Sequence, residues 1–376
     1  MRILILNWKD IKNPTSGGAE IVTFEHAKRW VAGGGHSVTW LTSSFKDSKK
    51  EEVVEGVSIK RFGNIYSVYL YAPFFYLFSG NKFDLVVDEV HGIPFFTPFF
   101  VRKPILVLIH EIAGEIWDYM YPAPVNYFGK FLEKIYLRLY ASKHFWTDAA
   151  GTIDELVKNG AKRQNCVSIP CPGNFSVLEK LPQKNKYPTF VWVSRIVKMK
   201  GIEEVISAFN IINRKYPEAE LNIIGDGKKD YVDYLKKQVK EKYALDANIH
   251  FLGYMNEEKK RKVLQKSHLL LHASVKEGWG LVVIEAASQG TPSVVYNVPG
   301  LNESVKNGIT GIVIKENTPE ELAGQAIRLY SNKDMYNKMQ IEGLKWAKSL
   351  NWDDASRKSL ALIEQITKSK EQRAKI

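Results

Sequence analysis

The chain has 376 residues, of which 45% are hydrophobic and 25% charged, a globular composition that excludes wholesale disorder. At roughly 100–200 residues per domain, this length predicts at least two domains. The formal net charge of +12 favours anionic partners, but Lys and Arg are spread widely without a dense basic tail, so no nucleic-acid partner is expected.

Short apolar runs alternate with amphipathic stretches along the first half of the chain, a pattern that favours strands alternating with helices. Strands are predicted at 2–6, 37–41, 85–87, 105–109, 143–146 and 166–169. Helices are predicted at 20–32 and 125–140. Uninterrupted apolar strands are typical of a parallel sheet covered on both faces, so we expect a doubly wound α/β domain.

A stretch rich in Pro, Lys and Asn, around residues 171–188, is predicted to link this domain to a second one. Further strands are predicted at 190–193, 221–224, 249–252, 268–272, 292–295 and 311–314. Further helices are predicted at 202–214, 230–242, 257–265, 280–289, 319–330 and 352–370. We therefore expect two Rossmann-like domains, residues 1–172 and 173–351, which face each other across a cleft beyond the carboxyl ends of their strands.

Cysteine usage and apolar run lengths indicate a cytoplasmic protein. Cys166 and Cys171 lack CxxC spacing and a nearby His, so neither zinc nor a disulfide framework is expected. The first apolar run, residues 3–6, is too short for the core of a secretory signal. No apolar run approaches the roughly 18 residues that span a bilayer.

The sharpest motif is Glu277-Gly278-Trp279-Gly280 with Glu285 further along, where a loop enters a predicted helix. Glycines let backbone N–H groups approach a ligand, and a helix N-terminus can hold a diphosphate without a metal. Carboxylates such as those of Glu277 and Glu285 accept hydrogen bonds from vicinal hydroxyls of sugars. The alternative is a tight loop with two solvated glutamates.

Basic and glycine-rich loops follow two other strands of the second domain. Arg195 and Lys200 lie between a predicted strand and helix, and their charges suit a diphosphate that gains charge as its sugar leaves. Ordinary surface charge is the alternative. Gly225-Asp226-Gly227 lacks the third glycine of a dinucleotide fingerprint, so a plain turn is the simpler interpretation.

In the first domain, Gly17 and Gly18 open the first predicted helix and so offer another glycine-lined helix start. His110 follows the predicted strand 105–109 and is placed on the ligand side of the sheet. A structural histidine is the alternative for His110.

Together these residues resemble family 4 of the retaining glycosyltransferases, which have the GT-B fold of two Rossmann-like domains. The matching motifs run in order along nearly the whole chain: Gly17-Gly18-Ala19-Glu20, His110, Arg195 with Lys200-Gly201, Gly225-Asp226-Gly227, and Glu277 to Glu285 as an E-x7-E motif.

The resemblance implies a role for each matched residue. Arg195 and Lys200 would bind the donor diphosphate, and Glu277 the hydroxyls of the donor sugar. Glu285 would hold the ribose, and His110 would touch the transferred sugar. The other implied donor contacts are the backbone of Trp279, Gly280 and Leu281, the base-bordering Tyr254 and Met255, Gly225, and the diphosphate-covering Gly17 and Gly18.

The resemblance also implies the reaction. A retaining transferase would move a hexose from a UDP- or GDP-linked sugar, bound by the second domain, to a glycan or lipid-linked acceptor on the first. The helix in 352–376 would pack back on the first domain. No Asp-x-Asp motif is present, so neither a metal nor another cofactor is expected. The residues at 148–150 and 171–173 depart from the family pattern, so the acceptor side and hinge are expected to differ from those of better-known members.

The predicted helix 125–140 suggests contact with an anionic membrane at the inner face of the plasma membrane. Lys130, Lys134 and Arg138 lie on about one face, and the aromatic and aliphatic residues lie largely on the other. Basic amphipathic helices with aromatic residues can lie on such membranes. An ordinary core-packed helix with solvated lysines is the alternative.

Two other functions are compatible with parts of the sequence, and a third is not supported by it. A nucleotide-sugar epimerase or hydrolase on the same fold would release sugar without an acceptor. A non-enzymatic polyanion-binding protein would bind heparin or nucleic acid with a steep salt dependence. A dehydrogenase would need a full GxGxxG fingerprint, which is missing here. The donor base, the sugar, the acceptor and the oligomeric state stay open.

Overall fold

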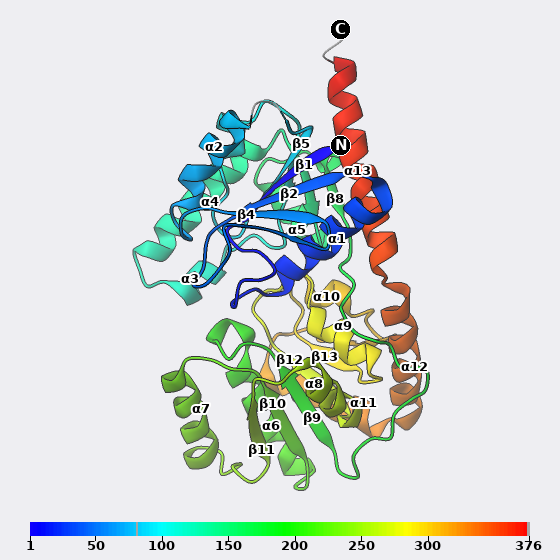
Figure 1. Ribbon diagram of the computed structural model, residues 1–376. Coiled ribbons are helices and arrows are strands. Elements are labelled where there is room, and N and C mark those ends of the chain that lie inside the picture. Colours follow the sequence, from blue (N-terminus) through cyan, green and yellow to red (C-terminus); the bar gives the residue numbers. More distant parts are fainter. Residues whose placement is uncertain (80–81, 374–376) are drawn as a thin grey trace. The chain divides into compact units, whose positions relative to one another are not determined.

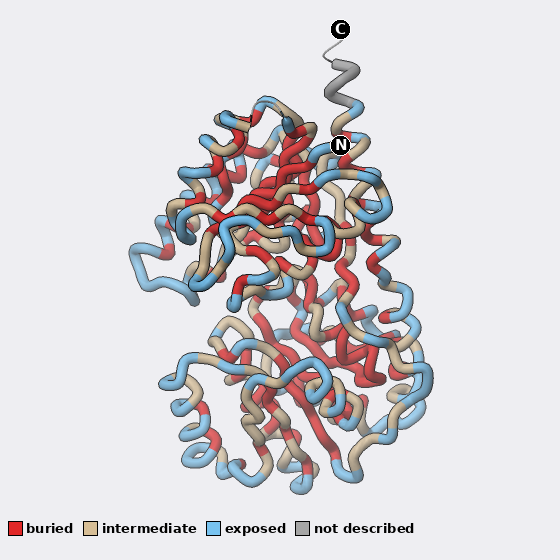
Figure 2. Tube along the Cα trace, in the orientation of Figure 1, coloured by how far each residue is buried: buried red, intermediate tan, exposed pale blue. Residues whose placement is uncertain are grey.

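The computed structural model describes residues 1–79 and 82–373, and the chain divides into two compact units. The first unit is built from Met1–Cys171 and the segment that begins at Asn351, and the second from Pro172–Leu350. Figure 1 labels many of the elements of both units, and Figure 2 shows that buried strands run through the interior of each.

The first unit has an eight-stranded sheet in the order β3-β4-β2-β1-β5-β6-β7-β8, in which only β3 is antiparallel to its neighbour. Its strands are β1 (Arg2–Leu6), β2 (Ser37–Thr42), β3 (Glu51–Val54), β4 (Val57–Arg61), β5 (Leu85–Glu89), β6 (Ile105–Leu108), β7 (His144–Thr147) and β8 (Cys166–Ser168). Its α-helices are α1 (Gly18–Gly34), α2 (Val68–Phe78), α3 (Ile116–Met120), α4 (Val125–Tyr140), α5 (Ala150–Lys158) and α13 (Trp352–Arg373). Short 3-10 turns lie at η1 (Thr97–Phe99) and η2 (Arg163–Asn165).

The second unit has a six-stranded, wholly parallel sheet in the order β11-β10-β9-β12-β13-β14. Its strands are β9 (Thr189–Val193), β10 (Glu220–Ile224), β11 (Ile249–Gly253), β12 (Leu269–His272), β13 (Ser293–Val295) and β14 (Gly311–Val313). Its helices are α6 (Ile202–Lys215), α7 (Lys229–Glu241), α8 (Glu257–Lys266), α9 (Leu281–Ser288), α10 (Leu301–Ser304), α11 (Pro319–Ser331) and α12 (Lys333–Ser349), with a 3-10 turn at η3 (Lys198–Lys200).

Both sheets are doubly wound, and each therefore has a topological switch point. In the first unit the strand order reverses between β1 and β5, and in the second between β9 and β12. Helices cover both faces of such sheets, so the central strands are apolar throughout; Ile3, Leu4, Ile5 and Leu6 of β1 are all 0% exposed. Ligands of doubly wound sheets bind beyond the carboxyl ends of the strands at these switch points.

The C-terminal helix α13 packs against α1 within the first unit, and the two helices lie side by side in Figure 1. Buried hydrogen bonds join them: Ser359 Oγ lies 2.9 Å from His26 Nδ1 and accepts from Trp30 Nε1 at 3.0 Å. Arg29 on α1 also pairs with Asp353 on α13. The segment after residue 351 is therefore part of the first unit, although its last three residues, 374–376, lie outside the described residues.

Candidate active site

A polar site of the second unit lies at its switch point, between the loops that follow β9 and β12. Lys200 belongs to the first loop and Glu277 to the second, and Lys200 Nζ lies 2.7 Å from Glu277 Oε1. A backbone hydrogen bond joins the two loops: Val275 N donates to Met199 O at 2.9 Å. Two residues singled out separately in the sequence thus form one ion pair.

Glu277 has a second partner that sequence reasoning did not identify. His272, the last residue of β12, places Nε2 3.1 Å from the same Glu277 oxygen, and its side chain is 1% exposed. Burial favours the neutral form of Glu277, but the charge of Lys200 and the hydrogen bond from His272 outweigh it, so the pKa of Glu277 lies well below that of an ordinary glutamate. Glu277 is therefore held ionised, with its orientation fixed from two sides.

Glu285, the second glutamate of the motif, lies within α9 and is buried. Lys260 of α8 places Nζ 2.8 Å from Glu285 Oε1, in an ion pair that lacks hydrogen-bond geometry. Burial raises the pKa of Glu285 to about 7, although the charge of Lys260 acts in the opposite direction. A buried carboxylate with unused acceptor capacity is suited to hydroxyl donors from a ligand.

The start of α9 also offers donor groups. Gly280 is the N-cap, with φ 77°, so the helix begins at Leu281, one residue later than predicted. Trp279 is 5% exposed, and within the described residues its indole Nε1–H has no hydrogen-bond partner. An unsatisfied buried donor beside a helix N-terminus is favourable for an anionic ligand.

The remaining predicted donor residues are near strand ends but are not joined to this ion pair. Arg195 follows β9 and is exposed, and no ion pair among the described residues includes it. Tyr254 and Met255 follow β11; Tyr254 is 81% exposed, while Met255 packs against the core. Their contacts with a base stay a prediction.

Gly225 has a structural requirement for glycine. It follows β10 with φ 141°, and a Cβ there would lie 1.8 Å from the carbonyl oxygen of Ser194. The glycine therefore lets the end of β10 approach the end of β9, where Arg195 begins its loop. This packing explains the Gly225 turn without a ligand, and a donor contact there stays a prediction.

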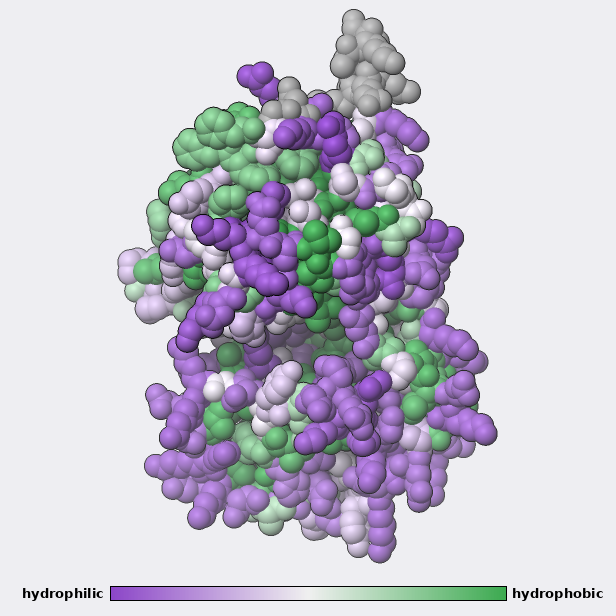
Figure 3. Space-filling model, in the orientation of Figure 1, coloured by the Kyte–Doolittle hydropathy of each residue, from purple (hydrophilic) through white to green (hydrophobic). Residues whose placement is uncertain are grey.

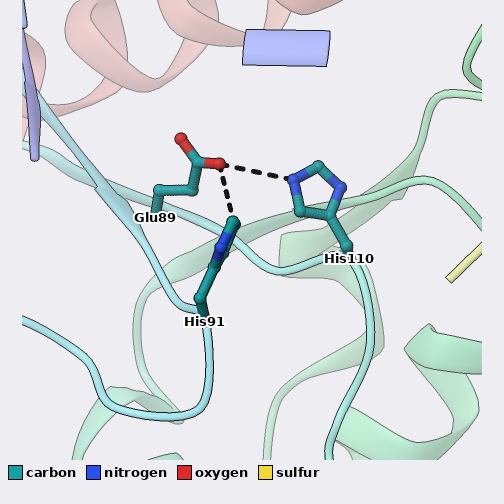
Figure 4. A group of neighbouring side chains, drawn as sticks. All are labelled: Glu89, His91 and His110. Carbon is teal, nitrogen blue, oxygen red and sulfur yellow. Dashed lines mark hydrogen bonds and ion pairs between the residues drawn. The ribbon is translucent and has the colours of Figure 1, made fainter. Parts of the chain in front are cut away.

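In the first unit, the structure brings His110 into a buried cluster at the switch point between β1 and β5. Figure 4 shows the His91 and His110 rings directed at one carboxylate, that of Glu89. The distances from Glu89 Oε1 are 2.9 Å to His91 Nε2 and 3.5 Å to His110 Nε2. On its other side, His110 Nδ1 lies 2.5 Å from Asp148 Oδ2. Burial favours neutral His110, but Asp148 and Glu89 outweigh it and raise the pKa of His110 well above its ordinary value.

The predicted glycine-lined helix start is tied to the same cluster. Gly17 N donates to Glu20 Oε2 at 2.6 Å, and Glu20 Oε1 lies 3.7 Å from His91 Nδ1. Gly18 is the first residue of α1. The N–H of Gly17 is thus already engaged by a side chain, and the covering of a diphosphate by Gly17 and Gly18 stays a prediction.

Several residues of these two sites were missed from the sequence: His272, Lys260, Glu89, His91 and Asp148. The sequence did offer a clue for His272 and Glu89. His272 is the last residue of the predicted strand 268–272, and Glu89 ends β5, of which residues 85–87 were predicted as a strand. Residues at the carboxyl ends of such strands lie on the ligand side of the sheet. His91 and Asp148 lie in loops, and Lys260 is one of several charges on a polar helix, so nothing in their spacing distinguishes them.

Comparison with known proteins identifies the second unit. Residues 176–346 match the family model described as Glycosyl transferases group 1. Residues 176–346 thus resemble a group 1 glycosyltransferase domain. This domain includes Lys200, Glu277 and Glu285 and covers most of the second unit.

Curated relatives of the glycosyltransferase domain are themselves named as glycosyltransferases. Poly(glycerol-phosphate) alpha-glucosyltransferase of Bacillus subtilis is 31% identical over 163 residues, which are 43% of this chain and 23% of that protein. The phosphatidylinositol N-acetylglucosaminyltransferase GPI3 subunit of Saccharomyces cerevisiae is 22% identical over 391 residues, covering 95% of this chain and 82% of that protein. The chain covers less than half the length of the relatives that are at least 30% identical.

Solved structures show the fold of both units. Sucrose-phosphate synthase of Thermosynechococcus elongatus has a TM-score of 0.77 at 17% identity and matches 98% of this chain and 99% of its own. HepE of Anabaena, in complex with UDP and glucose, has a TM-score of 0.74 at 17% identity, over 97% of this chain and 100% of its own. The predicted GT-B fold is confirmed. Assignment to family 4 within the group stays a prediction.

Proposed function

We propose that the protein is a retaining glycosyltransferase that moves a sugar from a UDP- or GDP-linked donor to a glycan or lipid-linked acceptor. The observation that carries the proposal is the partly buried, ionised Glu277 held by Lys200 and His272 at the switch point, beside the start of α9. HepE of Anabaena, of similar fold, was solved with UDP and glucose, which supports a nucleotide sugar as the donor. The group 1 relatives support sugar transfer over epimerisation or polyanion binding.

In the proposed reaction, the bond between the anomeric carbon and the donor diphosphate breaks. A bond to the acceptor hydroxyl oxygen forms on the same face of the sugar, and the acceptor's proton passes to the departing diphosphate oxygen. Lys200 and Arg195 stabilise the charge that gathers on that diphosphate, which makes the reaction independent of a metal ion. Glu277 orients the sugar hydroxyls, and His110 contacts the transferred sugar.

Glu285 gives the donor site a specific pH dependence. Ribose hydroxyls donate to an ionised carboxylate, so donor binding favours ionised Glu285 over the protonated form that burial stabilises. Because the pKa of Glu285 is about 7, raising the pH from 6 to 8 should strengthen binding of a nucleotide sugar by roughly tenfold. The Glu285→Gln variant should bind more weakly and lose this dependence.

A panel of nucleotide sugars screened by thermal shift at both pH values tests this prediction. A donor at 100 times its dissociation constant adds about 2.7 kcal/mol of stability. Each shift is compared with ligand-free protein at the same pH, because the raised pKa of Glu285 itself removes stability as pH rises from about 4.5 to about 7. If no nucleotide sugar stabilises the protein at either pH, the proposed function is wrong.

We also propose that the first unit contacts an anionic membrane through α4 and α2. The core-facing residues of α4 are Asn126, Gly129, Glu133, Tyr136, Leu137 and Tyr140, whereas its aromatic and aliphatic face is largely exposed, including Phe128 at 61% and Phe131 at 59%. The aromatic and aliphatic face, which a fully core-packed helix would bury, is therefore largely open to solvent. Lys134 and Arg138, both exposed, add positive charge to the same helix.

The helix α2 adds to this apolar surface, which Figure 3 shows as a hydrophobic area over α2. Leu70, Phe74, Leu77 and Phe78 are all more than half exposed, while Val68, Ala72 and Tyr76 pack into the same core cluster as α4. Apolar surface combined with cationic side chains is typical of proteins that lie on anionic lipid. Among the residues that the structure describes, every helix is too short or too polar to cross a bilayer.

Vesicle sedimentation tests this surface. We expect binding to vesicles that contain anionic lipid, weaker binding at high salt, and little binding to zwitterionic vesicles. The double variant Phe128→Ser with Phe131→Ser should lower binding at least tenfold, because each Phe side chain that enters the apolar part of the membrane contributes about 1.5–3 kcal/mol to binding. Ile341→Ser, at a residue of the second unit that is 44% exposed, is the matched control and should bind like wild type. If the Phe128 and Phe131 double variant binds vesicles as well as Ile341→Ser does, the exposed face of α4 is not the membrane contact.

A further inference from the structure

The Glu89, His91 and His110 cluster has the geometry of a metal-binding site. One ligand atom of each residue lies within 4.8 Å of the other two. The distances of 2.9 Å and 3.5 Å between Glu89 Oε1 and the two imidazole Nε2 atoms are close to the separation of neighbouring ligands around an ion with bonds of about 2.0–2.2 Å. Figure 4 shows that the two rings approach one oxygen of this carboxylate from different loops.

The surroundings of the cluster fit a metal site as well as the three residues do. Metal-binding histidines usually direct their other ring nitrogen at a carboxylate or carbonyl, which fixes the tautomer and the ring orientation. Here His110 Nδ1 lies 2.5 Å from Asp148, and His91 Nδ1 lies 3.7 Å from Glu20. The second oxygen of Glu89 accepts from Thr23 Oγ1 at 2.8 Å. Each of the three residues thus has a partner behind it.

Charge balance points the same way. Glu20, Glu89 and Asp148 are three carboxylates that are at most 4% exposed, and the imidazoles of His91 and His110 are paired with them. The carboxylates outnumber the imidazoles, and a bound cation would compensate buried negative charge that is otherwise unfavourable inside a protein.

We propose that Glu89, His91 and His110 bind a divalent transition-metal ion of the Zn²⁺ class. Two imidazoles and one carboxylate are a nitrogen–oxygen ligand set that suits zinc and its neighbours, and three protein ligands leave a position open for water or a ligand. The imidazole side chains are 17% and 13% exposed, so the site can be reached from solvent. The site involves neither Lys200 nor Glu277, and it does not depend on how the donor diphosphate is bound.

Metal binding would engage His110 and so exclude the sugar contact assigned to that residue. This consequence, unlike the binding itself, rests on the proposed function. Sugar transfer should continue in the presence of a chelator, and added Zn²⁺ should inhibit it. If Zn²⁺ binds without inhibition, the metal site stands and the assignment of His110 to the sugar is wrong.

Calorimetric titration of the untagged, chelator-treated full chain with Zn²⁺ tests the site, and Co²⁺ adds a visible absorption spectrum that reports imidazole ligation. We expect one equivalent to bind, with affinity at least about 100-fold lower in His91→Ala and about 10–100-fold lower in Asp148→Asn, which removes only a partner behind a ligand. His250→Ala, at a histidine of β11 in the other unit, is the control and should bind like wild type. Thermal unfolding verifies that each variant is folded. The proposal is overturned if wild type binds no Zn²⁺, or if folded His91→Ala and Asp148→Asn bind it as wild type does.

Discussion

The Lys200→Ala variant should lower the turnover number of sugar transfer by about 10²–10³-fold and change the KM for the donor much less. Lys200 is held beside the start of α9 by its 2.7 Å pair with Glu277, and its side chain is only 12% exposed. A preorganised charge in such a place is worth most where negative charge develops, which is on the departing diphosphate. The effect should therefore appear in the transition state more than in the bound donor.

Steady-state kinetics with the donor found in the nucleotide-sugar panel would measure this effect, and Lys198→Ala is its matched control. Lys198 lies in the same 3-10 turn but is exposed, and no ion pair among the described residues includes it. It should keep the wild-type turnover number. Equal, small losses in both variants would mean that Lys200 only contributes general surface charge. A loss confined to KM would place Lys200 in donor binding rather than in the chemical step.

Most strands of the sheets could be predicted because burial on both faces leaves a continuous apolar run. β1 and β9 have no exposed face, so their sequences show the pattern directly. The hairpin of β3 and β4 was missed for the opposite reason. Its outer strand is an edge with charged, partly exposed residues, and its turn at Glu55-Gly56 has positive φ at both positions without the usual Asn-Gly signal.

The helix α12 was missed because its contacts are made by small and polar residues. Its buried positions are Met339, Gln340, Gly343 and Ala347, which give almost no apolar periodicity. Gln340 is buried because its amide donates to Gly290 O at 2.8 Å. A local signal did exist, since Asn332 caps the helix by accepting from Met335 N at 3.0 Å, but one capping residue alone is common in loops.

The candidate site could be predicted where its chemistry lies in contiguous motifs. Lys200 and Glu277 were singled out separately, and the parallel topology brought them together because both follow strands at the switch point. Partners such as His272 and Lys260 could not be assigned in the same way. Their roles come from side-chain directions across neighbouring elements, which a sequence pattern does not contain.

The periodicity of α4 was predicted correctly, but its orientation depends on partners outside the helix. Glu133 is buried because both of its oxygens accept backbone N–H groups, from Ala113 at 2.8 Å and from Gly114 at 2.7 Å. These hydrogen bonds bury a polar face and leave Phe128 and Phe131 exposed. Hydrophobic patterning would place the same helix the other way round.

The pair of Arg61 and Asp10 is an ion pair of the first unit whose two side chains are fully buried. Arg61 at the end of β4 donates from Nε to Asp10 Oδ2 at 2.7 Å and from Nη2 to Oδ1 at 2.9 Å, and both side chains are 0% exposed. Its third nitrogen, Nη1, pairs with Glu52 and donates to Lys49 O. Asp10 lies in the loop between β1 and α1, so the pair holds in place the loop that precedes the glycines at the start of α1.

We expect Arg61→Met to lower the free energy of unfolding by about 3–5 kcal/mol, because it leaves the Asp10 carboxylate buried without a counter-charge. The double variant Asp10→Asn with Arg61→Met should recover part of this loss. The asparagine side chain brings no charge into the core, and its amide oxygen can still accept from Lys12 N as Asp10 does. Urea denaturation measures both effects. The partial recovery is the informative result, because loss of packing alone would make the double variant at least as unstable as the single one.

Arg2→Met is the matched control, because it also removes an arginine side chain that pairs with an aspartate from a strand of the same unit. Arg2 Nη2 donates to Asp84 Oδ1 at 3.1 Å, but the two side chains are 54% and 30% exposed. Solvent screens such a pair, and its removal should cost less than about 1 kcal/mol. A similar small loss in Arg2→Met and Arg61→Met would show that solvent reaches Asp10. If Arg61→Met loses much more unfolding free energy than Arg2→Met does, the uncompensated charge of Asp10 lies in the core. The Arg61–Asp10 pair then stabilises the loop that leads into α1.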